Sequence, residues 1–166
     1  ATTTVKGVAS FAAADFVTTS GAVTLNSLSF RAYKSLGAGS QALTTNTFTK
    51  ITLDTEDYDT GSYFASSRHT PLVAGTYLYM GSLLFNSIAD QKLTITSVFK
   101  NGAEAARFYS GASSGTSSPS IGGVYILQMN GSTDYVELYG YHEHGSNRNV
   151  DGGTAYCWFS GIRIGP

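Results

Sequence analysis

The sequence predicts an all-β sandwich, and three observations support that fold class. Only 13% of the 166 residues are charged, while tyrosine, threonine and small turn-forming residues are abundant, a composition that favours strands over helices. No segment shows the sustained apolar period of 3.6 residues that an amphipathic helix requires. Asn101-Gly102 and Asn130-Gly131 each separate two apolar runs, and both dipeptides are strong signals for a tight turn between paired strands.

Residues 1–26 differ in composition from the rest of the chain. They are rich in threonine, alanine and serine, and their isolated apolar residues cannot bury enough surface to fold alone. We therefore predict an N-terminal connector over residues 1–26 and a folded domain over residues 27–166.

The folded domain is predicted to be a succession of strands. Most of these segments alternate apolar and polar residues, as half-buried strands do. In chain order they span residues 27–33, 48–53, 74–85, 92–99, 105–109, 124–129, 134–141 and 154–164. Between them lie a turn at 37–40, an acidic, turn-rich stretch at 54–64, and polar loops at 86–91, 110–120 and 145–153.

The segment 74–85 is the longest aromatic and aliphatic run in the chain. Tyr77 and Tyr79 share one face of the expected strand, and Leu78 and Met80 share the other, so both faces are at least partly apolar. A strand of a monomeric sandwich needs only one apolar face. The second face therefore indicates assembly with another surface.

Two runs in the connector carry a resemblance to known proteins: Val5-Lys6-Gly7-Val8-Ala9-Ser10-Phe11 and Asp15-Phe16. Their offsets are similar to those of a connector in bacteriophage tail-fibre and related fibre proteins, where it precedes a C-terminal tip domain. The resemblance implies that this segment joins the folded domain to other fibre or spike proteins. It also implies a location on the exterior of a virion or phage-like particle.

Five motifs follow one another between residues 28 and 166. They are Phe30-Arg31-Ala32, Tyr58-Asp59-Thr60-Gly61-Ser62-Tyr63-Phe64, Pro71 with Gly75-Thr76-Tyr77-Leu78-Tyr79, Gly131-Ser132-Thr133-Asp134-Tyr135-Val136 and Phe159-Ser160-Gly161. In this order they resemble the C1q/TNF-like jelly roll, specifically the C1q-like globular head. The chain departs from that pattern at Tyr79, where phenylalanine is usual, in two extra residues between Gly131 and Asp134, and in lacking paired cysteines.

The resemblance implies a homotrimer in which the inner sheets of three copies pack around a three-fold axis. The segment 74–85 would be the inner-sheet strand, with one face in the protomer core and the other toward the axis. The residues predicted for the trimer interface are Tyr77, Tyr79, Leu83 and Phe85.

The strand order predicts which loops share an end of the sandwich. Successive connections of an antiparallel sandwich alternate between its ends, so the loops at 86–91, 110–120 and 145–153 would form a distal tip, opposite the connector and the C-terminus. Polar loops on a rigid sandwich often act in recognition, and aromatic rings and planar polar groups suit sugar. The candidate ligand-binding residues are Tyr139, Tyr141, His144, Asn147, Arg148, Asn149 and Asp151.

His142 and His144 form the sharpest local motif, since two histidines at i and i+2 project to one face of a strand. Three copies around an axis would offer six imidazoles to a metal ion. However, both histidines share a face with Val136 and Leu138, which would be the core face. We therefore favour hydrogen bonding at the strand end for both, and we expect no metal.

The remaining metal and thiol candidates are weaker. The acidic stretch has calcium-like spacing in Asp54, Glu56, Asp57 and Asp59, but it lacks the glycine and distal glutamate of a helix-loop-helix calcium site. Calcium is therefore an alternative only, and no cofactor is expected. His69 is assigned no role, and Cys157 is expected to be a small buried residue.

Several function classes are disfavoured. The formal net charge of −1 attracts neither nucleic acid nor anionic membrane, and no apolar run approaches the length needed for membrane insertion. The chain has no phosphate loop or paired histidine–acid metal signature, and nothing in the spacing of its carboxylates requires a glycosidase pair. We predict that the protein is not an enzyme.

Three functional hypotheses remain. The first is a receptor-binding (adhesin) tip of a trimeric phage or phage-like particle fibre that recognises bacterial cell-surface polysaccharide, either capsule or lipopolysaccharide. The second is a purely structural trimerisation cap of the fibre. The third is a secreted C1q/TNF-like ligand that binds a protein receptor.

Overall fold

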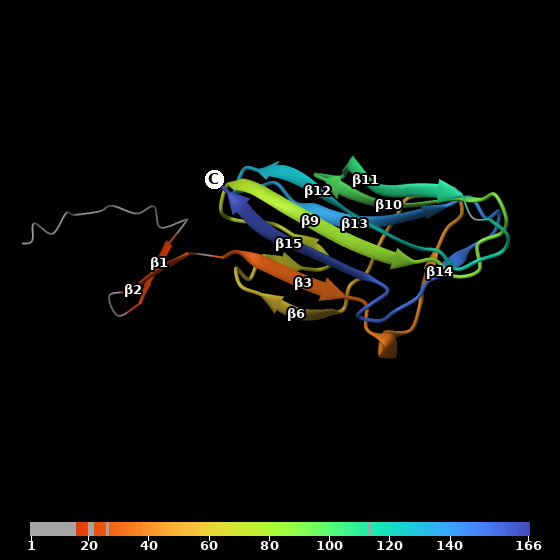
Figure 1. Ribbon diagram of the computed structural model, residues 1–166, viewed down its shortest axis with the longest axis horizontal. Coiled ribbons are helices and arrows are strands. Elements are labelled where there is room, and N and C mark those ends of the chain that lie inside the picture. The colour runs from red at the N-terminus through yellow and green to blue at the C-terminus, as the bar shows by residue number, and fades with distance from the viewer. Residues whose placement is uncertain (1–15, 20–21, 26, 113) are drawn as a thin grey trace, which may run out of the picture.

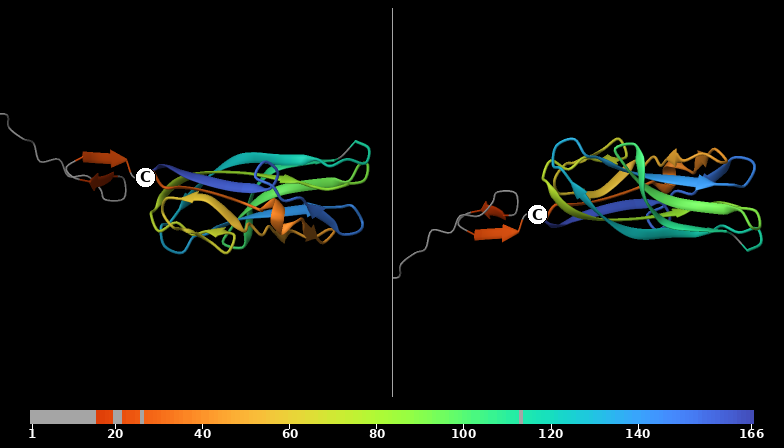
Figure 2. Two further views of the ribbon diagram at one scale, coloured as in Figure 1. Left: turned by 90° about the horizontal axis from the view of Figure 1, so that it is seen from below. Right: turned by 90° about the horizontal axis from the view of Figure 1, so that it is seen from above.

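The structure is a computed structural model that describes residues 16–19, 22–25, 27–112 and 114–166. Two antiparallel sheets lie face to face and form an elongated sandwich (Figures 1 and 2). The one helix among the described residues is the short 3-10 turn η1 (Leu36–Ala38). The all-β sandwich predicted from composition and periodicity is therefore confirmed.

Five strands form the first sheet, which we call the β9 sheet. Its order is β12 (Ser120–Met129), β9 (Gly75–Leu84), β15 (Trp158–Gly165), β3 (Ser29–Tyr33) and β6 (Thr55–Asp59). The acidic stretch supplies β6, although its composition predicted turns. It pairs with β3 as an edge strand and exposes Glu56, Asp57 and Tyr58, an arrangement of charge that protects a sheet edge from unwanted pairing.

The second sheet, which we call the β13 sheet, has the order β11 (Ala103–Ala112), β10 (Leu93–Lys100), β13 (Val136–His142), β8 (Arg68–His69) and β7 (Phe64–Ala65). The short β5 (Thr49–Lys50) also pairs with β13. A separate pair, β4 (Gln41–Leu43) with β14 (Arg148–Val150), lies at one end of the sandwich. Sequence patterns missed β14 because its partner is more than a hundred residues away in the chain.

The two turn signals have different outcomes. Asn101 and Gly102 both have positive φ and join β10 to β11 as paired neighbours, so the first hairpin is confirmed. The second hairpin is wrong, because β12 pairs with β9 while β13 pairs with β10 in the other sheet. Here the Asn130 side chain accepts the backbone N–H groups of residues 132–134, and this turn carries the chain from one sheet to the other.

Most of the predicted connector cannot be compared with the structure. Residues 1–15, 20–21 and 26 lie outside the described residues. Within the rest, β1 (Phe16–Thr19) and β2 (Ala22–Leu25) pair as an antiparallel hairpin that extends from the sandwich near the C-terminus (Figure 1).

An aromatic core holds the two sheets together. The ring of Tyr79 stacks on Phe159 at 5.7 Å, and the ring of Phe30 stacks on His69 at 4.4 Å. Nδ1 of His69 lies 3.0 Å from the Tyr79 hydroxyl, so each satisfies the other in a buried setting. His69, to which the sequence assigned no role, is a core residue. Burial lowers its pKa to about 3.

The residues predicted for the trimer interface are core residues of a single protomer. Burial alternates strictly along β9, and Tyr77, Tyr79, Leu83 and Phe85 are fully buried between the two sheets of one protomer. Their side chains therefore contact this chain's own core. The opposite face of β9, which carries Leu78 and Met80, points away from the core.

The tightness of this core gives a first prediction. A Cβ atom added at Gly161 would lie 2.7 Å from Cε1 of Phe30 and 2.9 Å from Cδ1 of Tyr79. Overpacking of this kind costs about 1–3 kcal/mol, so Gly161→Ala should lower the urea midpoint of unfolding measured by circular dichroism. Gly37→Ala is the matched control, since nothing lies within 4 Å of that position. Equal midpoints for the two variants would contradict the described packing.

Candidate functional site

The three loops predicted to share one end of the sandwich meet there. Ile88 and Ser117 form a reciprocal backbone bridge, with N–O distances of 2.7 and 2.9 Å. The backbone N–H of Asn86 donates to the carbonyl of Asn149 at 2.8 Å. Figures 1 and 2 show this end, which we call the tip, at the far side of the molecule from the C-terminus and the β1–β2 hairpin.

A small polar cavity opens at the tip. Its volume is about 230 Å³, and we call it the tip pocket. It is lined by Asn86, Ser87, Asn147, Arg148 and Asn149. Three of these residues were predicted ligand-binding residues. Asn86 and Ser87 were missed, because they come from a different loop and only the pairing of that loop with β14 brings them to the others.

The local fold holds Arg148 in place. Arg148 pairs with Leu43 of β4 in the β4–β14 ladder. Two residues further along β14, Val150 forms a backbone bridge with Phe85. The guanidinium donates through Nε to the carbonyl of Ser87 at 3.0 Å and through Nη1 to that of Asn147 at 3.5 Å. Ser87 has a φ of 53°, in the left-handed region.

Two of the predicted ligand-binding residues hold the tip together and do not line the pocket. Nδ1 of His144 accepts the backbone N–H of Ala89 at 2.9 Å. Both carboxylate oxygens of Asp151 lie 3.3 Å from Nδ2 of Asn86. Burial and the nearby positive charge of Arg148 lower the pKa of His144.

Tyr139 and Tyr141 lie elsewhere. They project from the outward face of the β13 sheet and join Phe48 and Phe99 in an outer aromatic cluster. The rings of Phe99 and Tyr139 stack at 4.0 Å, and those of Phe48 and Tyr141 lie 5.0 Å apart. The structure thus divides the predicted seven-residue site into a tip pocket, two tip-bracing residues and a separate aromatic cluster.

His142 serves the hydrogen-bonding role that its face predicted. It is fully buried; Nε2 lies 3.1 Å from the Leu43 carbonyl, and Nδ1 accepts the backbone N–H of His144 at 3.2 Å. Burial lowers the pKa of His142. Both ring nitrogens are therefore engaged, and among the described residues no group of three or more His, Cys, Asp or Glu is placed to hold a metal ion.

The acidic stretch is divided among separate structural roles. Asp54 accepts the backbone N–H of Ser35 at 2.8 Å, and Asp59 accepts that of Phe64 at 2.7 Å. Asp57 pairs with Arg31. These carboxylates do not converge on one point. Cys157 is fully buried as expected, and burial raises the pKa of its thiol to about 12.

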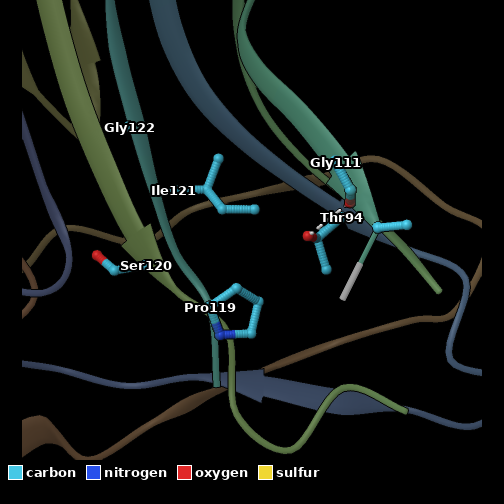
Figure 3. Close-up of a pocket in the computed structure, with 7 residues that line it drawn as sticks. Thr94, Gly111, Pro119, Ser120, Ile121 and Gly122 are labelled. Atoms are coloured by element: carbon cyan, nitrogen blue, oxygen red, sulfur yellow. Dashed lines mark hydrogen bonds between the residues drawn. The ribbon is translucent and has the colours of Figure 1, made fainter. Parts of the chain in front are cut away.

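A larger cavity of about 380 Å³ lies where the edge strands β11 and β12 diverge (Figure 3). The side chains of Thr94, Pro119 and Ile121 face this space, together with backbone at Gly111 and Gly122. The Thr94 hydroxyl donates to the Gly111 carbonyl at 3.3 Å. The lining carries no charged side chain, so it offers shape but few groups that could orient a ligand.

The outward face of the β9 sheet carries a group of apolar side chains that the register brings together. Ile126 of β12 pairs with Leu78, and Val124 pairs with Met80. Ile162 of β15 pairs with Leu78 from the other side. Because these five residues project from the same face, we call them the outward apolar face. Val124 is 57% exposed and Ile126 is 53% exposed.

The comparisons with known proteins concern the fold. No family model and no curated protein sequence matches the chain. Solved structures do match it. Murine APRIL has a TM-score of 0.59 and 9% identity, over 84% of this chain and 100% of that chain. The Eiger TNF structure from S. frugiperda has a TM-score of 0.59 and 9% identity, over 83% and 92%.

A third match comes from the other branch of the fold. The globular domain of zebrafish complement 1qA has a TM-score of 0.58 and 13% identity, over 84% of this chain and 98% of that chain. Identities this low are evidence of shared architecture and leave the ligand open. Among the described residues, no helix is long and apolar enough to cross a bilayer. The chain has the C1q/TNF-like jelly-roll fold.

Proposed function

We propose that the protein is a homotrimeric, non-catalytic recognition head at the outer end of a phage or phage-like particle fibre, where it binds bacterial cell-surface polysaccharide. The outward apolar face is the observation that carries this proposal. Val124 and Ile126 are more than half exposed in the single chain, beside Leu78, Met80 and Ile162. Contiguous apolar surface of this kind usually marks a protein contact.

The edges of the sandwich support self-association. Strands β11 and β12 stand at the same side of the two sheets, and each pairs with one strand only among the described residues. Exposed sheet edges invite pairing unless another surface covers them. A neighbouring copy that packs against this side of the sandwich would cover both the outward apolar face and the edges of β11 and β12. The C1q/TNF-like resemblance implies that three copies assemble.

The ends of the sandwich support a role in attachment. The β1–β2 hairpin and the C-terminus lie at one end of the sandwich, and the tip lies at the other (Figure 1). The residues that line the tip pocket belong to the loops of the tip. A chain joined to a fibre through residues 1–26 would direct the tip outward. The amide and guanidinium groups at the tip match the hydroxyl-rich surface of a polysaccharide.

Two other functions remain as alternatives. A secreted C1q/TNF-like ligand that binds a protein receptor is favoured by the fold it shares with murine APRIL and Eiger TNF. A structural cap of the fibre needs the outward apolar face but makes no use of the tip pocket. Both alternatives also predict a trimer. A test of polysaccharide binding at the tip therefore has to distinguish them from the proposed recognition head.

Selective labelling tests the role of the tip. Ser146 is exposed in a tip loop, and Ser132 is exposed in the loop after β12, at the end near the C-terminus. Ser146→Cys coupled to a large maleimide polymer should abolish binding to immobilised capsule or lipopolysaccharide, whereas Ser132→Cys with the same label should bind normally. Cys157 should stay unlabelled, because it is fully buried and burial raises the pKa of its thiol to about 12.

Each other outcome points to a different function. Equal binding by both labelled proteins would place the contact away from the tip and would reject the proposal. Binding to host-membrane proteins but to no polysaccharide would favour the secreted protein-binding ligand. A fibre that lacks the folded domain but is trimerised by a foreign segment, and that still adsorbs normally, would favour the structural cap.

A further inference from the structure

We propose that the tip pocket binds an acidic sugar, with the guanidinium of Arg148 paired to the carboxylate of a uronic or similar acid. The inference rests on the proposed function, because it names the class of polysaccharide that the tip would bind. It follows from the charge of one side chain, from the rigidity of its support and from the groups around it.

Arg148 differs from three other arginines of the chain, which form ion pairs with carboxylates. Arg31, Arg68 and Arg107 each form a salt bridge, with Asp57, Glu137 and Glu104 respectively. Arg148 has no carboxylate within salt-bridge distance among the described residues, and it donates instead to two backbone carbonyls. Its positive charge is therefore left for an external anion.

The guanidinium is already oriented. Nε and Nη1 are bound to the carbonyls of Ser87 and Asn147, so Nη2 is the nitrogen best placed to donate to a ligand. The β4–β14 pairing and the Phe85–Val150 bridge fix the backbone on both sides of this residue. Binding would therefore cost little side-chain entropy, which is the main advantage of an arginine that is held before the ligand arrives.

The rest of the pocket suits a sugar ring. Asn147 is exposed at the rim, and Asn149 is anchored by a 2.9 Å bond from its Nδ2 to Oγ of Ser40. Amide groups of this kind hydrogen-bond to sugar hydroxyls. At about 230 Å³ the pocket has space for one sugar residue and little more, because pockets for drug-sized ligands begin near 300 Å³.

Two acids of the tip loops, Asp151 and Asp90, have other partners than Arg148. Both oxygens of Asp151 are directed to Nδ2 of Asn86, and Asp151 does not line the pocket. Asp90 is bound to the backbone N–H of Gly115 in the neighbouring loop. In the proposed trimer the pocket occurs three times, so modest affinity at one site becomes useful avidity on a repeating polysaccharide.

Matched polysaccharides provide the test. Wild-type protein is applied to an immobilised polysaccharide rich in glucuronic acid, and to the same polysaccharide after chemical reduction of its carboxylates to hydroxymethyl groups. We expect binding to fall about ten- to hundredfold on reduction, since a charge-assisted hydrogen bond is lost. This comparison needs no variant, so it is independent of any effect on folding.

Variants assign the effect to Arg148. Arg148→Ala should lose the preference for the acidic polysaccharide, and Arg148→Lys should keep part of it, because lysine retains the charge but not the planar fork. Arg107→Ala removes the same charge from an exposed position in β11 and should leave binding unchanged.

Equal binding to the acidic and reduced forms, or an unchanged preference in Arg148→Ala, would overturn the inference. If the labelled Ser146→Cys protein still lost binding in that case, the polysaccharide-binding tip would stand and only its acidic specificity would fail. If the label at the tip had no effect, the proposed function itself would fail.

Discussion

Ile126→Asp is expected to convert the proposed trimer into monomers that remain folded. Ile126 is 53% exposed on the outward apolar face and pairs in register with Leu78. In a monomer the new carboxylate would stay in water, so the fold should tolerate it. In the assembled protein three carboxylates would be buried against apolar neighbours, and each unpaired buried charge costs several kcal/mol.

Leu36→Asp is the matched control for this substitution. Leu36 is a 76% exposed apolar residue in η1 and does not belong to the outward apolar face. Sedimentation velocity should show a smaller species for Ile126→Asp only, with the circular dichroism of both variants unchanged. A trimer that persists in Ile126→Asp would exclude this face as the interface.

The second large effect expected is a loss of stability in mild acid caused by His69. Burial lowers the pKa of His69 from 6.5 to about 3 in the folded state, so the unfolded chain binds this proton at a higher pH than the folded chain does. The stability that the folded protein gains by keeping His69 neutral is fully present above pH 6.5 and is lost as the pH falls toward 3. The loss is about 1.4 kcal/mol per pH unit over most of that window, and on the order of 5 kcal/mol in total.

Urea unfolding at fixed protein concentration between pH 7.5 and 4.5 measures this dependence. The double variant His69→Phe with Tyr79→Phe removes both members of the buried hydrogen-bonded pair, so that neither polar group is left without its partner. Its stability should fall less steeply below pH 6.5. Some slope should remain, since burial also lowers the pKa of His142. The same slope in both proteins would contradict a core location for the His69 proton site.

Much of the fold follows from the sequence because strand periodicity is local. All eight predicted segments contain strands. The face of β9, by contrast, could not be chosen from alternation, since Tyr77 and Tyr79 on one side and Leu78 and Met80 on the other are all apolar. The larger aromatic rings fill the space between the sheets, and that space is set by neighbours such as Phe30 and Phe159, which are distant in the chain.

The candidate site was predicted less well than the fold. The order of the loops along the chain correctly predicted that loops 86–91 and 145–153 lie at the same end of the sandwich. It was not enough to show that Tyr139 and Tyr141 project from the outward face of the β13 sheet, or that Asn86 and Ser87 complete the pocket around Arg148. Those positions depend on pairing between segments far apart in sequence, which no local pattern records.

The mass of the intact protein in solution tests the central claim most directly. The claim is that the outward apolar face holds three copies together and so presents three tip pockets on one side. Size-exclusion chromatography with light scattering at micromolar concentration should give three times the chain mass of 17.5 kDa. A species of 17.5 kDa that persists as the concentration is raised would contradict the account.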